Sequence, residues 1–114
     1  MAQCFYLACC LVLSDGATSA ADNFHSVPVF EAGKEGYNVY RIPALIKAAN
    51  GDLLSFCEAR AGGDASEIDL VMKRSTDDGR SWSGLQVVQE SESFRNLFPA
   101  NSPPISVGNP APVV

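Results

Sequence analysis

Short apolar segments separated by turn-forming residues follow one another along the chain from position 39 onward. Residues 39–47 and 53–59 are rich in β-branched and apolar side chains, and the Asn50-Gly51 pair between them tolerates the positive φ of a tight hairpin. Residues 68–75 predict a third strand and residues 85–90 a fourth. Four strands in sequence order with short connections predict one antiparallel meander and an all-β fold.

Two features qualify this pattern. Pro43 lacks the backbone N–H that a sheet requires, so it belongs at an edge, at a strand start or at a break in the ladder. Residues 91–105 carry Pro and Ser and predict a loop, whereas residues 106–114 form an apolar, strand-like run at the chain end. Because this strand-like run stops at the chain end, we interpret the chain as a fragment or a truncated gene product.

An apolar stretch covers residues 4–13 near the N-terminus. Ten helical residues at about 1.5 Å each are too short for a bilayer core of about 30 Å, but they suit the centre of a secretory signal. Small residues follow, and they allow cleavage after Ala20. We therefore predict a signal peptide over residues 1–20 and a lysosomal or extracellular destination, with cytoplasmic and membrane-associated locations left open.

Composition excludes several classes of function. The chain has 114 residues, with 13 Asp and Glu against 8 Lys and Arg and a net charge of -5, so it offers no basic surface for nucleic acid or anionic lipid. Three cysteines lie in the N-terminal stretch, which leaves Cys57 without a disulfide partner after cleavage. No Cys, His or carboxylate cluster has zinc spacing, and we expect no metal and no cofactor.

The turn between the third and fourth predicted strands carries the most specific motif, S-x-D-x-G-x-[TS]-W over residues 75–82. Asp77 can accept backbone N–H groups, Gly79 relieves the cost of positive φ, and Trp82 can pack against the sheet. Together with Ser75 these residues are predicted to be structural. The motif resembles the Asp-box, or BNR, repeat of sialidases and of other β-propellers.

Three more segments resemble sialidase motifs in the same order. Residues 40–43, YRIP, are similar to the family's [FY]-R-I-P motif, residues 58–60 to its E-x-R segment, and residues 108–112 to the N-P-x-P stretch that opens its second blade. The resemblance implies that residues 21–114 are the N-terminal part of a catalytic six-bladed β-propeller: the first blade and the start of the second. Blades of about 40–50 residues mean that a complete propeller cannot fit in this chain.

The resemblance also implies a substrate site. Arg41 matches the first of three arginines that bind the carboxylate of sialic acid, and a planar, permanently charged guanidinium suits that task. Arg60 matches a position on the 4-hydroxyl side of the sugar, Asn109 a further substrate-binding position, and Asp64 the general acid and base. Arg60 could instead form a surface ion pair with Glu58 or Glu67, and Asp64 could be a solvated loop residue.

The other groups of the reaction are less accessible from the sequence. Glu67 and Asp69 are the next candidates if Asp64 is not the acid. Sialidases use a tyrosine nucleophile, but Tyr6, Tyr37 and Tyr40 all precede the point where the family carries it. The covalent step and the other two arginines therefore cannot be assigned to this chain.

The resulting prediction is the N-terminal fragment of an exo-α-sialidase, a glycoside hydrolase that removes terminal α-linked sialic acids from oligosaccharides, glycoproteins or gangliosides. A sialylated glycan is the expected partner, and the sequence does not imply membrane association. The main alternative is a non-enzymatic glycan-binding or structural Asp-box propeller, which would keep the Asp-box while losing Arg41 or Asp64. A secreted single-blade interaction module is a third hypothesis, but it would leave one apolar face of the sheet uncovered.

Overall fold

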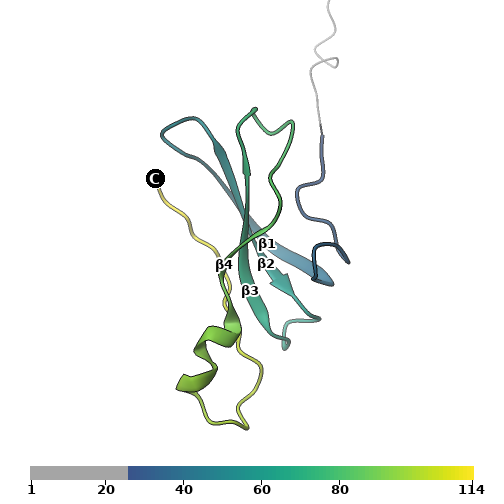
Figure 1. The fold of residues 1–114 in the computed structure, drawn as a ribbon, viewed down its shortest axis with the longest axis vertical. Helices are drawn as coiled ribbons and strands as arrows, with labels where there is room; N and C mark the ends of the chain where they lie inside the picture. Colours follow the sequence, from purple (N-terminus) through teal and green to yellow (C-terminus); the bar gives the residue numbers. More distant parts are fainter. Residues whose placement is uncertain (1–25) are drawn as a thin grey trace, which may run out of the picture.

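A computed structural model describes residues 26–114, so the predicted signal peptide and its cleavage point lie outside the described residues. Four strands form one sheet: β1 (Val39–Lys47), β2 (Leu53–Arg60), β3 (Ile68–Ser75) and β4 (Gln86–Gln89). They lie in sequence order and each neighbouring pair is antiparallel (Figure 1). The predicted all-β meander is confirmed, with β2 one residue longer and β4 two residues shorter than expected.

The turn between β1 and β2 has the chemistry that its sequence predicts. Gly51 has a φ of 93°, in the region that favours glycine. The Ala48 N–H donates to the Asp52 carbonyl at 2.8 Å, and the Gly51 N–H donates back to the Ala48 carbonyl at 2.9 Å. The Asn50 side chain bonds the Asp52 carboxylate at 2.8 Å. These local bonds fix the register of the hairpin and hence the positions of side chains along both strands.

Strand β1 is interrupted at Pro43. Arg41 lies opposite Glu58 and Ala44 lies opposite Phe56, so Ile42 and Pro43 together face a single residue of β2. This two-against-one arrangement is a β-bulge. The prediction that Pro43 marks a break in the ladder is therefore confirmed, because its missing N–H costs no ladder bond there.

The best-buried part of the molecule lies on the two central strands. Cys57, Ala59 and Val71 form its core, and Phe30, Tyr37, Tyr40 and Leu85 pack against them. Two of these aromatic residues come from the segment before β1, which runs along the sheet (Figure 1). This segment thus covers a surface of β2 and β3 that would otherwise face water.

The segment after β4 differs from its prediction. A 3-10 helix, η2 (Ser91–Leu97), replaces the first half of the predicted loop. Asp69 on β3 explains it: its carboxylate accepts the backbone N–H of Ser91 at 2.7 Å and the Ser91 hydroxyl at 2.8 Å. A side chain distant in sequence therefore fixes the first turn. No helix within residues 26–114 is long and apolar enough to cross a bilayer.

The strand-like run predicted at the chain end is also wrong for the described residues. Only Ser106 pairs, in an isolated parallel bridge with Ile68, where the Val107 N–H donates to the Ile68 carbonyl at 2.9 Å. Pro110 and Pro112 lack N–H donors, so the residues beyond the bridge cannot continue a regular ladder. The chain nevertheless runs back beside the sheet, which brings Asn109 near β2 (Figure 1).

Candidate functional site

Five segments of the chain line one open hollow of about 380 Å³. Strand β1 supplies Arg41, strand β2 supplies Glu58 and Arg60, and the following loop supplies Asp64. The hollow is completed by Ile42, Ile68, Ser106, Gly108 and Asn109. All four residues predicted to bind or act on a substrate therefore lie together. The sheet register explains part of this, since Arg41 is opposite Glu58 and residues two apart on a strand share a face.

Arg60 is held by two carboxylates. Its Nε donates to Glu58 Oε2 at 2.9 Å, its Nη2 pairs with the same oxygen, and its Nη1 pairs with Asp64 Oδ1. Arg60 and Glu58 are both buried, so the pair is not the surface ion pair considered as an alternative. The hydrogen bonds that Arg60 donates to Glu58 and Asp64 raise the pKa of Arg60 above its ordinary value. Its charge and orientation are therefore fixed.

Glu58 is the residue whose role the sequence did not reveal. Besides Arg60, it accepts the backbone N–H of Asn109 at 2.8 Å through Oε1. A Cβ on Gly108 would lie 2.9 Å from the Glu58 carboxyl carbon, so only glycine allows this approach. The E-x-R spacing, which places both side chains on one face, was the signal that could have indicated a buried pair. Glu58 thus joins β2 to the chain segment that carries Asn109.

Arg41 and Asp64 form the exposed part of the site. Arg41 Nη1 lies 3.0 Å from Asp64 Oδ1, and the two side chains are 54% and 78% exposed. The hydrogen bond from Arg60 and the charges of Arg41 and Arg60 hold the pKa of Asp64 below its ordinary value. Asp64 is therefore an ionised carboxylate in this arrangement. A base has that form, whereas a general acid must first gain a proton.

Arg41 has one carboxylate partner in the hollow, Asp64, whereas Arg60 has two. Two guanidinium groups face two carboxylates, and Arg60 already pairs with both Glu58 and Asp64. An incoming carboxylate would find Arg41 as its accessible partner and would compete with Asp64 for it. The site can therefore exchange one carboxylate for another at Arg41.

The two reserve candidates for the acid are engaged elsewhere. Asp69 accepts the Tyr37 hydroxyl at 2.7 Å as well as Ser91, and Glu67 pairs with Arg95 at 2.7 Å. Neither carboxylate lines the hollow. Burial and the bond to Asp69 raise the pKa of Tyr37, so its hydroxyl stays protonated. Within residues 26–114 no group of three His, Cys, Asp or Glu side chains could hold a metal ion.

The predicted structural motif closes the turn between β3 and β4. The buried Ser75 hydroxyl bonds Asp77 Oδ1 at 2.8 Å and accepts the Gly79 N–H at 2.9 Å. Asp77 also accepts the Ser81 N–H at 2.9 Å, and bonds from the Ser81 and Ser75 groups lower the pKa of Asp77 to about 2. Gly79 has a φ of 84°, and Trp82 lies beside it. A hollow of about 420 Å³ borders this turn, but neither Arg41 nor Asp64 lines it.

No family model matches the chain. A sialidase of Micromonospora viridifaciens is 43% identical over 63 residues, which is 54% of this chain and 10% of that protein. The chain is related to sialidases over part of its length. An anhydrosialidase of Macrobdella decora is 34% identical over 77 residues and a sialidase of Paraclostridium sordellii 32% over 74 residues.

The matched stretches cover more than half of this chain but only a small part of each relative. The matched stretches are 64% and 61% of this chain for the second and third relatives, but 9% and 18% of those proteins. The chain thus spans a small part of the length of the curated relatives it matches. The predicted resemblance to sialidases is confirmed at this level, together with an all-β sheet of four strands.

Proposed function

We propose that residues 26–114 form part of the substrate site of an exo-α-sialidase, in which Arg41 binds the carboxylate of a terminal sialic acid. The observation that carries the proposal is the Arg41–Asp64 pair at the open hollow, 3.0 Å apart and exposed to solvent. Arg41 already holds a carboxylate there, so a substrate carboxylate of the same charge and shape can take that place. The sequence relationship to sialidases supports this choice of anion.

Arg60 and Asn109 have supporting roles in this proposal. Arg60 is fixed in the wall of the hollow by Glu58, where its guanidinium can face a sugar hydroxyl without moving. Asn109 is held against the same wall through its backbone N–H, which leaves its side-chain amide for a ligand. Both residues therefore orient the sugar once Arg41 has bound its carboxylate.

Asp64 acts as the general acid and then as the base. When the substrate carboxylate takes Arg41, Asp64 loses a cation and gains an anion as its neighbour, and both changes raise the pKa of Asp64. The protonated carboxyl gives its proton to the leaving glycosidic oxygen, and the resulting carboxylate takes a proton from the attacking water. Substrate binding would thus convert the ionised Asp64 of the free site into an acid.

The wider setting belongs to the same proposal. The four-stranded antiparallel sheet is consistent with one blade of a six-bladed propeller, with residues 106–114 leading into the next blade. A signal peptide over residues 1–20 would direct the protein to the secretory pathway, where sialylated glycoproteins and glycolipids are the substrates at hand.

The proposal is tested by titrating the isotope-labelled chain with methyl α-sialoside and with the methyl ester of that sugar. A single arginine contact predicts a Kd on the order of millimolar, which NMR shift changes can follow. We expect shifts at Arg41, Asp64 and Asn109 with the acid and none with the uncharged ester, and we expect Arg41→Ala to abolish them. Equal shifts with both sugars, or unchanged binding by Arg41→Ala, would overturn the proposal.

A further inference from the structure

The β-bulge in strand β1 lies directly beside the exposed arginine of the hollow. Consecutive side chains of a regular strand point to opposite faces of the sheet. Arg41 and Ile42 nevertheless line the same hollow, although they are neighbours in sequence. The bulge accounts for this, because Ile42 and Pro43 together face Cys57 and the extra residue turns the strand.

The backbone of the bulge is strained. Ile42 has a φ of 55°, in the left-handed region that β-branched residues rarely adopt. A residue in such a conformation persists only where its surroundings hold it, and such positions gather at binding and active sites. The next residue, Pro43, cannot donate to the ladder, so the local sequence does not favour a return to regular pairing.

Cys57 holds the bulge from the partner strand. Its thiol is buried, and Sγ donates a hydrogen bond to the Arg41 carbonyl oxygen at 3.0 Å. Burial raises the pKa of Cys57 to about 11, which keeps the thiol protonated as a donor at neutral pH. The contact fixes the peptide unit that follows the Arg41 side chain. Through this hydrogen bond, a free cysteine in the core contacts the backbone of a residue that lines the hollow.

We propose that Cys57 and the Ile42–Pro43 bulge form a positioning device that turns Arg41 toward the hollow. Cys57 and Ile42 are then positioning residues, because they act through Arg41. This positioning proposal rests on the proposed function in one respect: it takes the carboxylate of sialic acid as the ligand of Arg41. Its geometric part, the coupling of Cys57 to the Arg41–Asp64 pair, can be measured without any ligand.

The test compares Cys57→Ala with Cys57→Ser in the full chain, using NMR pH titration of the Asp64 carboxyl carbon. Arg41→Ala sets the largest rise in the Asp64 pKa that loss of Arg41 can produce. Cys57→Ala removes the donor and should give a measurable part of that rise, together with a several-fold weaker Kd for methyl α-sialoside. Cys57→Ser restores a donor and should return both quantities most of the way to wild type.

A matched control separates positioning from stability. Leu85 packs against the same core and does not line the hollow, so Leu85→Ala should lower stability while leaving the Asp64 pKa unchanged. A second variant, deletion of Pro43, removes the extra residue and should uncouple Arg41 from Asp64 to the extent that Arg41→Ala does.

The outcomes are distinct. An Asp64 pKa unchanged from wild type in both Cys57→Ala and the Pro43 deletion would overturn the positioning device. A shift of equal size in Leu85→Ala would overturn it as well, because the effect would then follow stability. A different result separates the two proposals. If Cys57→Ala shifts the Asp64 pKa and Cys57→Ser reverses the shift, the positioning device stands. If methyl α-sialoside at the same time binds neither the wild type nor any variant, the proposed function fails.

Discussion

Two carboxylates of one site differ in what surrounds them, and this difference assigns their roles. Glu58 is 3% exposed and has both oxygens committed, to Arg60 and to the Asn109 backbone. Asp64 is exposed and pairs with both Arg41 and Arg60. A buried, saturated carboxylate holds structure, whereas an exposed one that can lose a partner can change its protonation.

Replacing Glu58 should therefore damage the fold. Glu58→Ala leaves Arg60 buried with one exposed carboxylate as its partner, and breaking a buried pair in this way costs about 3–5 kcal/mol. The free energy of unfolding, measured by urea denaturation, should fall by that order. Glu67→Ala serves as the control, since the Glu67 side chain is 49% exposed and its pair with Arg95 should contribute about 1 kcal/mol or less. Equal losses in the two variants would contradict the assignment of Glu58 as a structural residue.

At the scale of elements, the sequence predicted those strands whose determinants are local. Alternating and β-branched residues gave β1 and β3 with their observed bounds, and the turn residues Asn50 and Gly51 fixed the first hairpin. Pro43 indicated a ladder break, but the residue that would take the positive φ could not be predicted, because that depends on the partner strand.

The 3-10 helix and the contacts within the site were missed for one physical reason, which is that residues distant in sequence decide them. The 3-10 helix η2 begins where Asp69 of another element accepts two bonds from Ser91. The site residues Arg41, Arg60, Asp64 and Asn109 were found through their resemblance to family motifs. Their mutual contacts, including the pairing of Asp64 with Arg41, depend on how the loop after β2 folds back over the sheet, which no local pattern encodes.

The Asp-box turn predicts a specific acid dependence of stability. The pKa of Asp77 is lowered to about 2 from an ordinary 3.8, so its contribution to stability is complete above about pH 4 and is lost as the pH falls through 2. Unfolding free energies of wild type and Asp77→Asn should differ by a constant amount above pH 5. That difference should shrink between pH 4 and pH 2, because the wild-type carboxylate gains its proton there. A difference independent of pH would show that Asp77 does not act through its charge.

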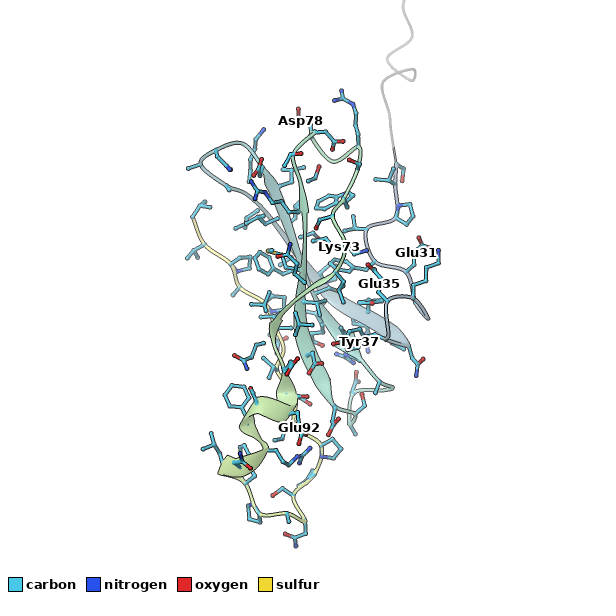
Figure 2. All side chains as sticks on the ribbon, in the orientation of Figure 1. Glu31, Glu35, Tyr37, Lys73, Asp78 and Glu92 are labelled. Atoms are coloured by element: carbon cyan, nitrogen blue, oxygen red, sulfur yellow. The ribbon has the colours of Figure 1, made fainter. Side chains whose placement is uncertain are left out.

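At the scale of the whole molecule, one partly buried ion pair ties the segment before β1 to the sheet. Lys73 on β3 is 11% exposed and lies 2.5 Å from Glu35, whose carboxylate also accepts the Leu85 N–H at 3.1 Å (Figure 2). The Lys73 ammonium is 5.6 Å from the centre of the Phe30 ring. The pairing with Lys73 lowers the pKa of Glu35. The Lys73–Glu35 pair therefore connects the segment before β1 to β3 and to Leu85, the residue before β4.

Loss of Lys73 should loosen this segment. Lys73→Met leaves Glu35 without its cation and should lower the free energy of unfolding by about 1–3 kcal/mol. The double variant with Glu35→Gln should recover part of that loss, because the two residues interact directly. Lys47→Met is the control: its pair with Asp78 is 3.5 Å long and exposed, so little change is expected. Additive effects of the Lys73 and Glu35 substitutions would refute the tie.

The 114-residue chain by itself should not hydrolyse a sialoside. Hydrolysis with a covalent intermediate needs a nucleophile at the hollow, and the family's nucleophile is a tyrosine. The two described tyrosines are committed elsewhere: Tyr37 donates to Asp69 at 2.7 Å and Tyr40 to the Lys34 carbonyl at 2.9 Å, and neither lines the hollow. Burial raises the pKa of both, which makes them poorer nucleophiles.

We therefore expect the isolated chain to bind methyl α-sialoside weakly and to release no fluorophore from an aryl sialoside, as followed by fluorescence over hours. The aryl leaving group makes this a severe test, because it departs without help from an acid and leaves the nucleophile as the missing component. Heat-denatured chain provides the background rate. Turnover above that background, abolished by Arg41→Ala, would mean that the described residues carry out the covalent step without a tyrosine, and Asp64 would then be the first candidate for the nucleophile.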